Sequence, residues 1–92
     1  MGFKKYCAEI LDTIENIDLI ILNEDFSAYH DIRKSLIKAI NYLFDNKKVD
    51  AEKHLFLCIR LLMEAPPKNK ALGLETLLKI DSIYKNLSSQ SS

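Results

Sequence analysis

Glycine, proline and tryptophan are scarce in this chain. Its 92 residues include two glycines, two prolines that stand together as Pro66 and Pro67, and no tryptophan. Glycine and proline interrupt regular structure most often, so a chain with so few of them favours long helices over many short strands. The composition, 48% apolar and 28% charged, is that of a globular protein. The length suffices for one domain and not for two.

An excess of charge of either sign is also missing. Lysine and arginine total 13, and aspartate and glutamate total 13. A general nucleic-acid binder needs net positive charge to displace counterions from phosphate, so this balance argues against nucleic acid as a partner. It argues equally against a protein that binds membranes through charge alone.

Long apolar runs are absent as well. The longest, residues 19–22 and 55–59, fall far short of the roughly 20 apolar residues that a membrane-spanning helix needs. The first twelve residues, MGFKKYCAEILD, lack the apolar core of a secretory signal. We therefore expect a cytoplasmic protein that does not span a membrane.

Cysteine occurs only at Cys7 and Cys58, and both lie within apolar helical patterns. A secreted domain held together by disulfides usually carries more cysteines and places them in loops. Two buried thiols in a reducing cytosol are the favoured interpretation. A bridge between them stays open, because it depends on whether their two helices touch.

What the chain does have is helical periodicity. Apolar residues recur at steps of three and four in four segments, and the links between these segments are short. Short links make neighbouring helices antiparallel. We therefore predict an all-α, antiparallel four-helix bundle that forms a single domain over residues 1–87, followed by a flexible polar tail over residues 88–92. The expected helices cover residues 3–22, 28–46, 51–64 and 69–87.

The helix ends and faces follow from the same pattern. Asp25 or Ser27 is expected to cap the second helix, and Asp50 the third, by accepting from free backbone amides. Residues 54–63, HLFLCIRLLM, are apolar nearly all round, which is typical of a helix surrounded by others. The buried side of the second helix is predicted to consist of Tyr29, Ile32, Leu36, Ile40, Leu43 and Phe44.

Side chains suited to catalysis are few. His54 and Cys58 lie four residues apart on one predicted helix, and a thiolate–imidazole pair would suit redox or hydrolytic chemistry. Nothing nearby suggests an oxyanion site, so a hydrogen-bonded structural role for His54 is favoured. Glycine-rich phosphate loops, CxxC pairs and metal-ligand spacings are missing. We expect no catalytic residue, no cofactor and no metal; the protein is expected to bind another protein.

Arg60 is the one charge inside the apolar centre of the third helix. The favoured interpretation is that its aliphatic stem packs against neighbours while its head reaches solvent or Glu64, one helical turn away. A polar anchor at an interface with a partner is the alternative.

The second predicted helix carries a more specific pattern. It resembles the second helix of bacteriocin immunity proteins of the enterocin A/pediocin-like, or class IIa, type. The segment Glu9-Ile10-Leu11 and the position of Asp50 before an apolar helix fall in the comparable order. The residues of the second helix that carry the resemblance are Tyr29, Asp31, Ile32, Leu36, Lys38, Leu43 and Lys47.

The resemblance implies a cytosolic, monomeric, antiparallel four-helix bundle without enzymatic activity. Such proteins protect a producer cell from its own bacteriocin, and they act from inside the cell at the mannose permease. The C-terminal half and tail are thought to decide which bacteriocin is recognised. For this chain the resemblance therefore implies a protein partner, a complex of permease and bacteriocin. The contact residues it implies are Lys70, Lys79, Tyr84, Lys85 and Asn86.

An alternative interpretation concerns residues 35–67, which also resemble one helix hairpin of the tetratricopeptide type. Cys58 would be the small residue of its second helix, and Pro66 would follow that helix. Proteins of this kind include small secretion or assembly chaperones, which hold a partner helix in a groove. A single hairpin cannot bury both of its faces, so this alternative predicts a complex with a partner protein.

Overall fold

The four segments with helical periodicity form four α-helices. The computed structural model describes residues 2–90, and these contain no β-strand. The all-α prediction is therefore confirmed for the described part of the chain. The helices are α1 (Lys4–Asn23), α2 (Ser27–Phe44), α3 (Lys48–Glu64) and α4 (Lys70–Ser88).

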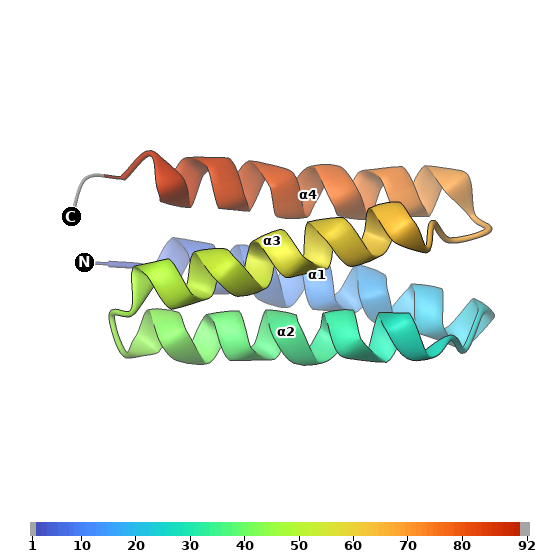
Figure 1. Ribbon diagram of the computed structural model, residues 1–92, viewed down its shortest axis with the longest axis horizontal. Coiled ribbons are helices and arrows are strands. Elements are labelled where there is room, and N and C mark those ends of the chain that lie inside the picture. The colour runs from blue at the N-terminus through green and yellow to red at the C-terminus, as the bar shows by residue number, and fades with distance from the viewer. Residues whose placement is uncertain (1, 91–92) are drawn as a thin grey trace.

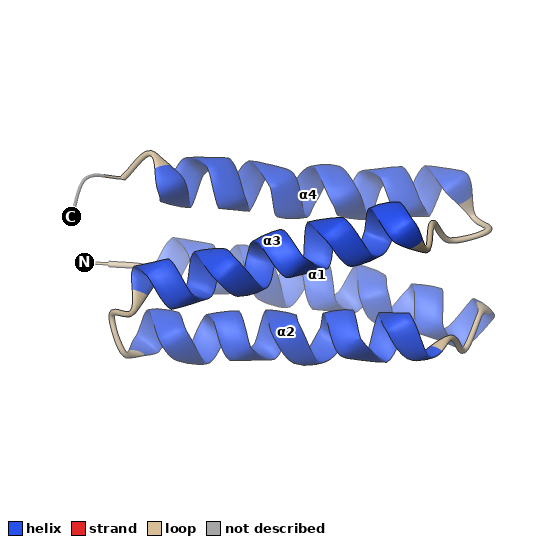
Figure 2. Cartoon of the chain, in the orientation of Figure 1, coloured by secondary structure: helices blue, strands red, loops and turns tan. Residues whose placement is uncertain are grey.

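Each helix packs against two others, and the four occupy the corners of an antiparallel bundle (Figure 1). Both α1 and α3 pack on α2 and α4, and the α2–α3 interface is the most extensive. The links at 24–26, 45–47 and 65–69 are the only loops between helices (Figure 2). Links of this length return the chain antiparallel to the helix before it. The predicted four-helix bundle is thus confirmed, with a long dimension of 38 Å.

All four helices contribute to one apolar core. Fully burying a leucine or isoleucine side chain stabilises a fold by about 1.5–3 kcal/mol, so the core supplies most of the driving force for folding. The hydroxyl of Tyr29 donates to the carbonyl oxygen of Ala65 at 2.9 Å, which satisfies the polar end of that buried ring. The largest fully buried apolar side chains are Ile10, Ile17, Ile20, Tyr29, Ile32, Leu36, Leu55, Ile80 and Leu87.

Two predictions about apolar faces need correction. Phe44 was assigned to the buried side of α2, but it is 70% exposed, whereas Leu43 beside it is buried. Leu43 faces the core, and Phe44, about 100° further round the helix, points away from it. Similarly, α3 is not surrounded by other helices, and Phe56 and Met63 are exposed. The reason is that α3 occupies a corner and touches only α2 and α4.

The caps of α2 and α3 also differ from those predicted. Phe26 precedes α2 in an extended conformation without a side-chain cap, and Ser27 is already helical. Asp25 instead pairs with His30 at 2.6 Å. Helix α3 starts three residues earlier than expected, so Asp50 lies in its first turn. There its carboxylate interacts favourably with the positive end of the helix dipole, but it does not cap the helix.

The early start of α3 depends on Asn46. This residue has a φ of 58°, in the left-handed region that asparagine tolerates better than most residues. The turn lets the backbone N–H of Lys47 donate to the carbonyl of Tyr42 at 2.8 Å. Helix α3 can therefore begin at Lys48, after the short link 45–47.

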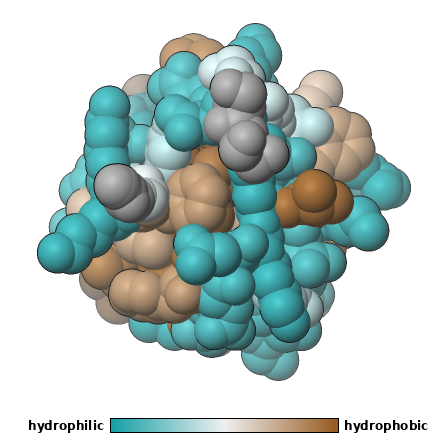
Figure 3. Space-filling model, turned by 90° about the vertical axis from the view of Figure 1, so that its left-hand side faces the viewer, coloured by the Kyte–Doolittle hydropathy of each residue, from teal (hydrophilic) through white to brown (hydrophobic). Residues whose placement is uncertain are grey.

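The predicted polar tail is in part helical. Ser88 is the last residue of α4, and Gln90 donates from Nε2 to the Tyr6 hydroxyl at 2.9 Å. This contact joins the end of the chain to α1. Residues 91 and 92, which belong to the predicted tail, lie outside the described residues. Figure 3 views the bundle from the end that carries both termini, where apolar atoms reach the surface among hydrophilic ones.

Pro67 and Gly73 form a close contact that joins the last link to α4. Pro67 is buried, and a Cβ atom on Gly73 would lie 2.9 Å from its Cδ. Real Cβ contacts are not that short, so the absence of a side chain at residue 73 allows the proline ring to pack against α4. Asn69 accepts from the backbone N–H of Leu72 at 3.1 Å and caps the helix just before this contact.

Gly73→Ala is therefore expected to destabilise the protein. In most helix interiors this exchange gains up to about 1 kcal/mol. Here overpacking against the Pro67 ring should outweigh that gain and lower the free energy of unfolding by about 1 kcal/mol. Urea unfolding followed by circular dichroism measures the change.

The matched control is the same exchange in a Pro67→Ala background. Without the ring, Gly73→Ala should become stabilising, and the difference between the two backgrounds gives the coupling energy. Equal effects in both backgrounds would show that the Pro67 contact does not explain the glycine.

Candidate functional site

The five predicted contact residues of α4 do not form one surface. Lys70 borders the interface with α3, and Tyr84 packs against Phe56 of α3 with ring centroids 5.8 Å apart. Lys79 faces α1 instead. The remaining two predicted residues, Lys85 and Asn86, are exposed. The bundle therefore places Lys70 and Lys79 in two different grooves, one on each side of α4.

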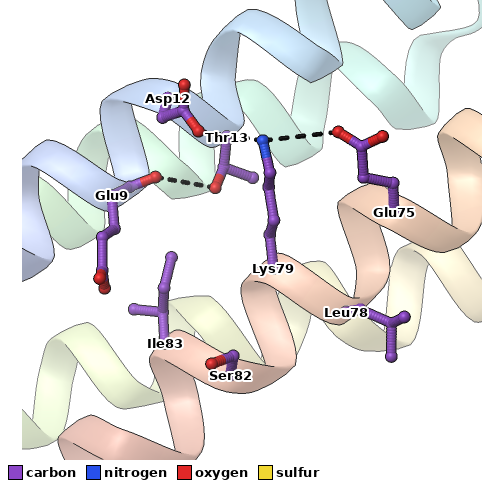
Figure 4. Close-up of a pocket in the computed structure, with 8 residues that line it drawn as sticks. All are labelled: Glu9, Asp12, Thr13, Glu75, Leu78, Lys79, Ser82 and Ile83. Carbon is purple, nitrogen blue, oxygen red and sulfur yellow. Dashed lines mark hydrogen bonds and ion pairs between the residues drawn. The ribbon is translucent and has the colours of Figure 1, made fainter.

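The α1–α4 groove, drawn in Figure 4, is centred on Lys79. Its ammonium lies 2.9 Å from Asp12 and 3.6 Å from Glu75. The hydrogen bond that Lys79 donates to Asp12 is the main cause that raises the pKa of Lys79, because it favours the charged form. The positive charge of Lys79 is thus already paired within the protein. The groove is lined by Glu9, Asp12, Thr13, Glu75, Leu78, Lys79, Ser82 and Ile83.

Below Lys79 the interface between α1 and α4 is polar. The buried amide of Asn16 donates to Glu75 at 3.2 Å and to the Thr76 hydroxyl at 3.3 Å. Thr76 donates in turn to the carbonyl of Leu72 at 2.7 Å. These bonds determine how α1 and α4 align along their length, because a shifted helix would leave buried polar atoms without partners. The polar residues of this groove therefore have a structural role, which is to hold α1 and α4 together.

The α3–α4 groove is different in character. It is a concave region of about 450 Å³ at the end of the bundle opposite the termini, with an apolar floor. Met63 and Leu74 stand exposed on its two rims, at 67% and 58% of their full accessible surface. A groove of this size and lining is within the usual range for ligand-binding sites. It is lined by Leu62, Met63, Pro66, Pro67, Lys68, Lys70, Gly73, Leu74 and Leu77.

The apolar surface continues from this groove along the two helices. Val49, Phe56 and Met63 are exposed on α3 at spacings of seven residues, so they follow one line along the helix. Tyr84 of α4 lies against Phe56 and extends the surface across the interface. Exposed apolar side chains that gather along one interface mark interaction sites more often than isolated apolar residues do.

Sequence reasoning identified only part of this surface. Lys70 and Tyr84 were among the predicted residues, but Met63 and Leu74 were not. Met63 was assigned to a helix that was expected to be surrounded by other helices. The seven-residue spacing of Val49, Phe56 and Met63 was the available signal, although a pattern in one helix does not reveal which neighbours cover it.

The environment of His54 and Cys58 does not favour a thiolate–imidazole pair. Cys58 is fully buried, and its Sγ donates to the carbonyl of Ile32 at 3.6 Å. Burial raises the pKa of its thiol to about 12, which disfavours the thiolate that a nucleophile requires. His54 stacks on Tyr42 with ring centroids 5.3 Å apart. Cys7 and Cys58 are both free thiols, so the bridge left open by the sequence is not formed.

Arg60 lies at the surface. Its guanidinium is 3.7 Å from the Glu64 carboxylate, the partner expected one turn along the helix, and both side chains are more than half exposed. An exposed pair at this spacing contributes only about 0.3–0.5 kcal/mol to stability.

Comparisons with known proteins add no family. No protein-family model, curated protein or solved structure matches the chain. Within residues 2–90, no group of three or more histidine, cysteine, aspartate or glutamate side chains could hold a metal ion. None of the four described helices is long and apolar enough to cross a membrane. The functional argument therefore rests on the geometry of the bundle and its surface.

His54 should make the stability of the bundle sensitive to mild acid. Burial is the main cause that lowers the pKa of His54, the charge of Lys38 adds to it, and Asp50 opposes it. In addition, no hydrogen-bond partner for the buried Nδ1 is present among the described residues. The unfolded chain then takes up a proton more readily than the folded one.

The stabilisation by neutral His54 is therefore complete above the unfolded pKa of about 6.5, and it should diminish as the pH falls below that value. Melting temperatures of the wild type and of His54→Gln between pH 7.5 and 5 provide the test. The wild type should lose more stability than the variant over this interval. Parallel curves would show that His54 is not the cause.

Proposed function

We propose that this protein is a non-enzymatic, cytosolic bacteriocin immunity protein that protects its producer cell by binding a protein partner through α3 and α4. The observation that carries the proposal is a bundle that closes its core within one chain and leaves an apolar groove in its C-terminal half. The antiparallel four-helix bundle agrees with the fold that the resemblance of residues 29–47 implies. The groove lies in the half of the chain that the resemblance associates with recognition.

The closed core also supports this proposal over the chaperone alternative. Helices α2 and α3 do form an antiparallel hairpin with the most extensive interface in the bundle. However, α1 covers α2 and α4 covers α3 within the same chain, and Ile17, Leu36, Leu55 and Ile80 meet in the shared core. A hairpin that is already covered does not need a partner in order to fold.

Protection of sensitive cells tests the proposal directly. The full chain would be expressed in a bacterium that carries the mannose permease and is killed by pediocin-like bacteriocins, and a panel of these would be applied. We expect a several-fold increase in the concentration of at least one bacteriocin that is needed to stop growth. Leu74→Ser should reduce protection, because it removes an exposed apolar side chain from the groove rim.

Leu78→Ser is the matched control. Leu78 is on the same helix and is 57% exposed, nearly the same as Leu74, but it lies in the α1–α4 groove. This variant should protect as well as the wild type does. If the folded wild-type chain accumulates in the cells and protects against no member of the panel, the immunity proposal is wrong.

A further inference from the structure

The charged residues that line the α3–α4 groove are of one sign. Lys68 and Lys70 line it, and neither ammonium forms an ion pair with a described residue. The first turn of α4 contains no acidic residue, so the positive end of the helix dipole adds to the charge of Lys70. Glu24 accepts from the backbone N–H of Lys68 at 2.5 Å and forms no ion pair with its ammonium. The groove therefore presents an apolar floor with two lysines, and no carboxylate, among its lining residues.

The shape of the groove suits an elongated occupant with one apolar side. Two antiparallel helices form its walls, Met63 of α3 and Leu74 of α4 are exposed on them, and the half-buried Leu77 also lines it. The apolar surface continues along the same interface to Phe56 and Tyr84. An amphipathic helix that lies along such an interface inserts side chains spaced by three, four and seven residues. A flat membrane surface would not reach the floor of a concave site.

We infer that the α3–α4 groove binds an amphipathic helix of a partner protein in which aspartate or glutamate residues flank the apolar side. The inference rests on the protein-binding part of the proposed function and specifies the chemistry of the partner. The apolar side chains of that helix would cover Met63, Leu74 and Leu77. Its carboxylates would pair with Lys68 and Lys70, where complementary charge decides which helices bind and how fast.

Titration with two synthetic helices tests the inference. One peptide, about as long as α3, carries leucine at every third and fourth position with glutamate on both flanks. The other has the same leucines with lysine in place of glutamate. Binding to the full chain would be followed by the fluorescence of a dye attached to the peptide and by chemical shifts of the leucine and methionine methyl groups of the protein. We expect the acidic peptide to bind at least about tenfold more tightly than the basic one.

Variants locate the bound peptide. Leu74→Ser should weaken binding of the acidic peptide by about tenfold, whereas its control Leu78→Ser should leave binding unchanged. Lys70→Glu should weaken binding of the acidic peptide and strengthen binding of the basic peptide. Added salt should reduce the difference in affinity between the two peptides. Lys5→Glu, an exposed change on α1, controls for the change in net charge. Circular dichroism verifies that each variant is folded.

Several results would overturn the inference. Equal binding of both peptides would show that the groove does not select acidic helices. An equal loss of affinity for the acidic peptide in Leu74→Ser and Leu78→Ser would show that the peptide does not bind in this groove. Binding of the chain to vesicles of anionic lipid without binding of the acidic peptide would assign the surface to a membrane. A dimer in light scattering that Leu74→Ser dissociates, without peptide binding, would assign it to a second copy of the chain.

The two proposals fail separately. Peptide binding without protection of sensitive cells would leave the acidic-helix site in place and refute the immunity function. Protection that persists in Leu74→Ser and Lys70→Glu, without binding of the acidic peptide, would retain the immunity function and refute the acidic-helix site.

Discussion

The structure depends on one geometric constraint: each helix has only two neighbours. Three short links return the chain in alternate directions and place the helices in cyclic order around one core. Each helix can therefore bury only the sides that face the core and its neighbours. Apolar residues beyond that limit remain at the surface, and this is why Phe56 and Met63 of the strongly apolar α3 are exposed.

The two interfaces of α4 divide structural and recognition roles. Its interface with α1 contains polar groups that are already paired, since Asn16, Thr76 and Lys79 satisfy one another or nearby carboxylates. Along its interface with α3, apolar side chains are exposed to solvent. Lys68 and Lys70, which line the groove there, form no ion pair with a described residue. Polar groups that are already paired offer little to another molecule, whereas exposed apolar surface gains free energy when a partner covers it. The proposed binding site therefore lies on the α3 side.

The polar side chains in and around the core have structural roles. Cys58 donates to a backbone carbonyl, Tyr29 donates to another, and His54 stacks on Tyr42. Each of these groups stabilises or specifies helix packing, and Cys58 is held as a thiol by burial. A binding role needs only the surface of such a bundle, and the core can then be optimised for packing.

The sequence by itself determined the helix count, the antiparallel order and most of the core, because apolar periodicity and short links allow few other arrangements. It did not determine the start of α3, which depends on the left-handed turn at Asn46. Nor did it reveal the contact of Gly73 with Pro67 or the exposure of Phe44. Only the tertiary structure decided that Lys79 would pair with Asp12 at the interface with α1, whereas Lys70 would lie beside the apolar groove at the interface with α3. The physical reason is that a helical pattern specifies a face, whereas the neighbours that cover that face come from distant parts of the chain.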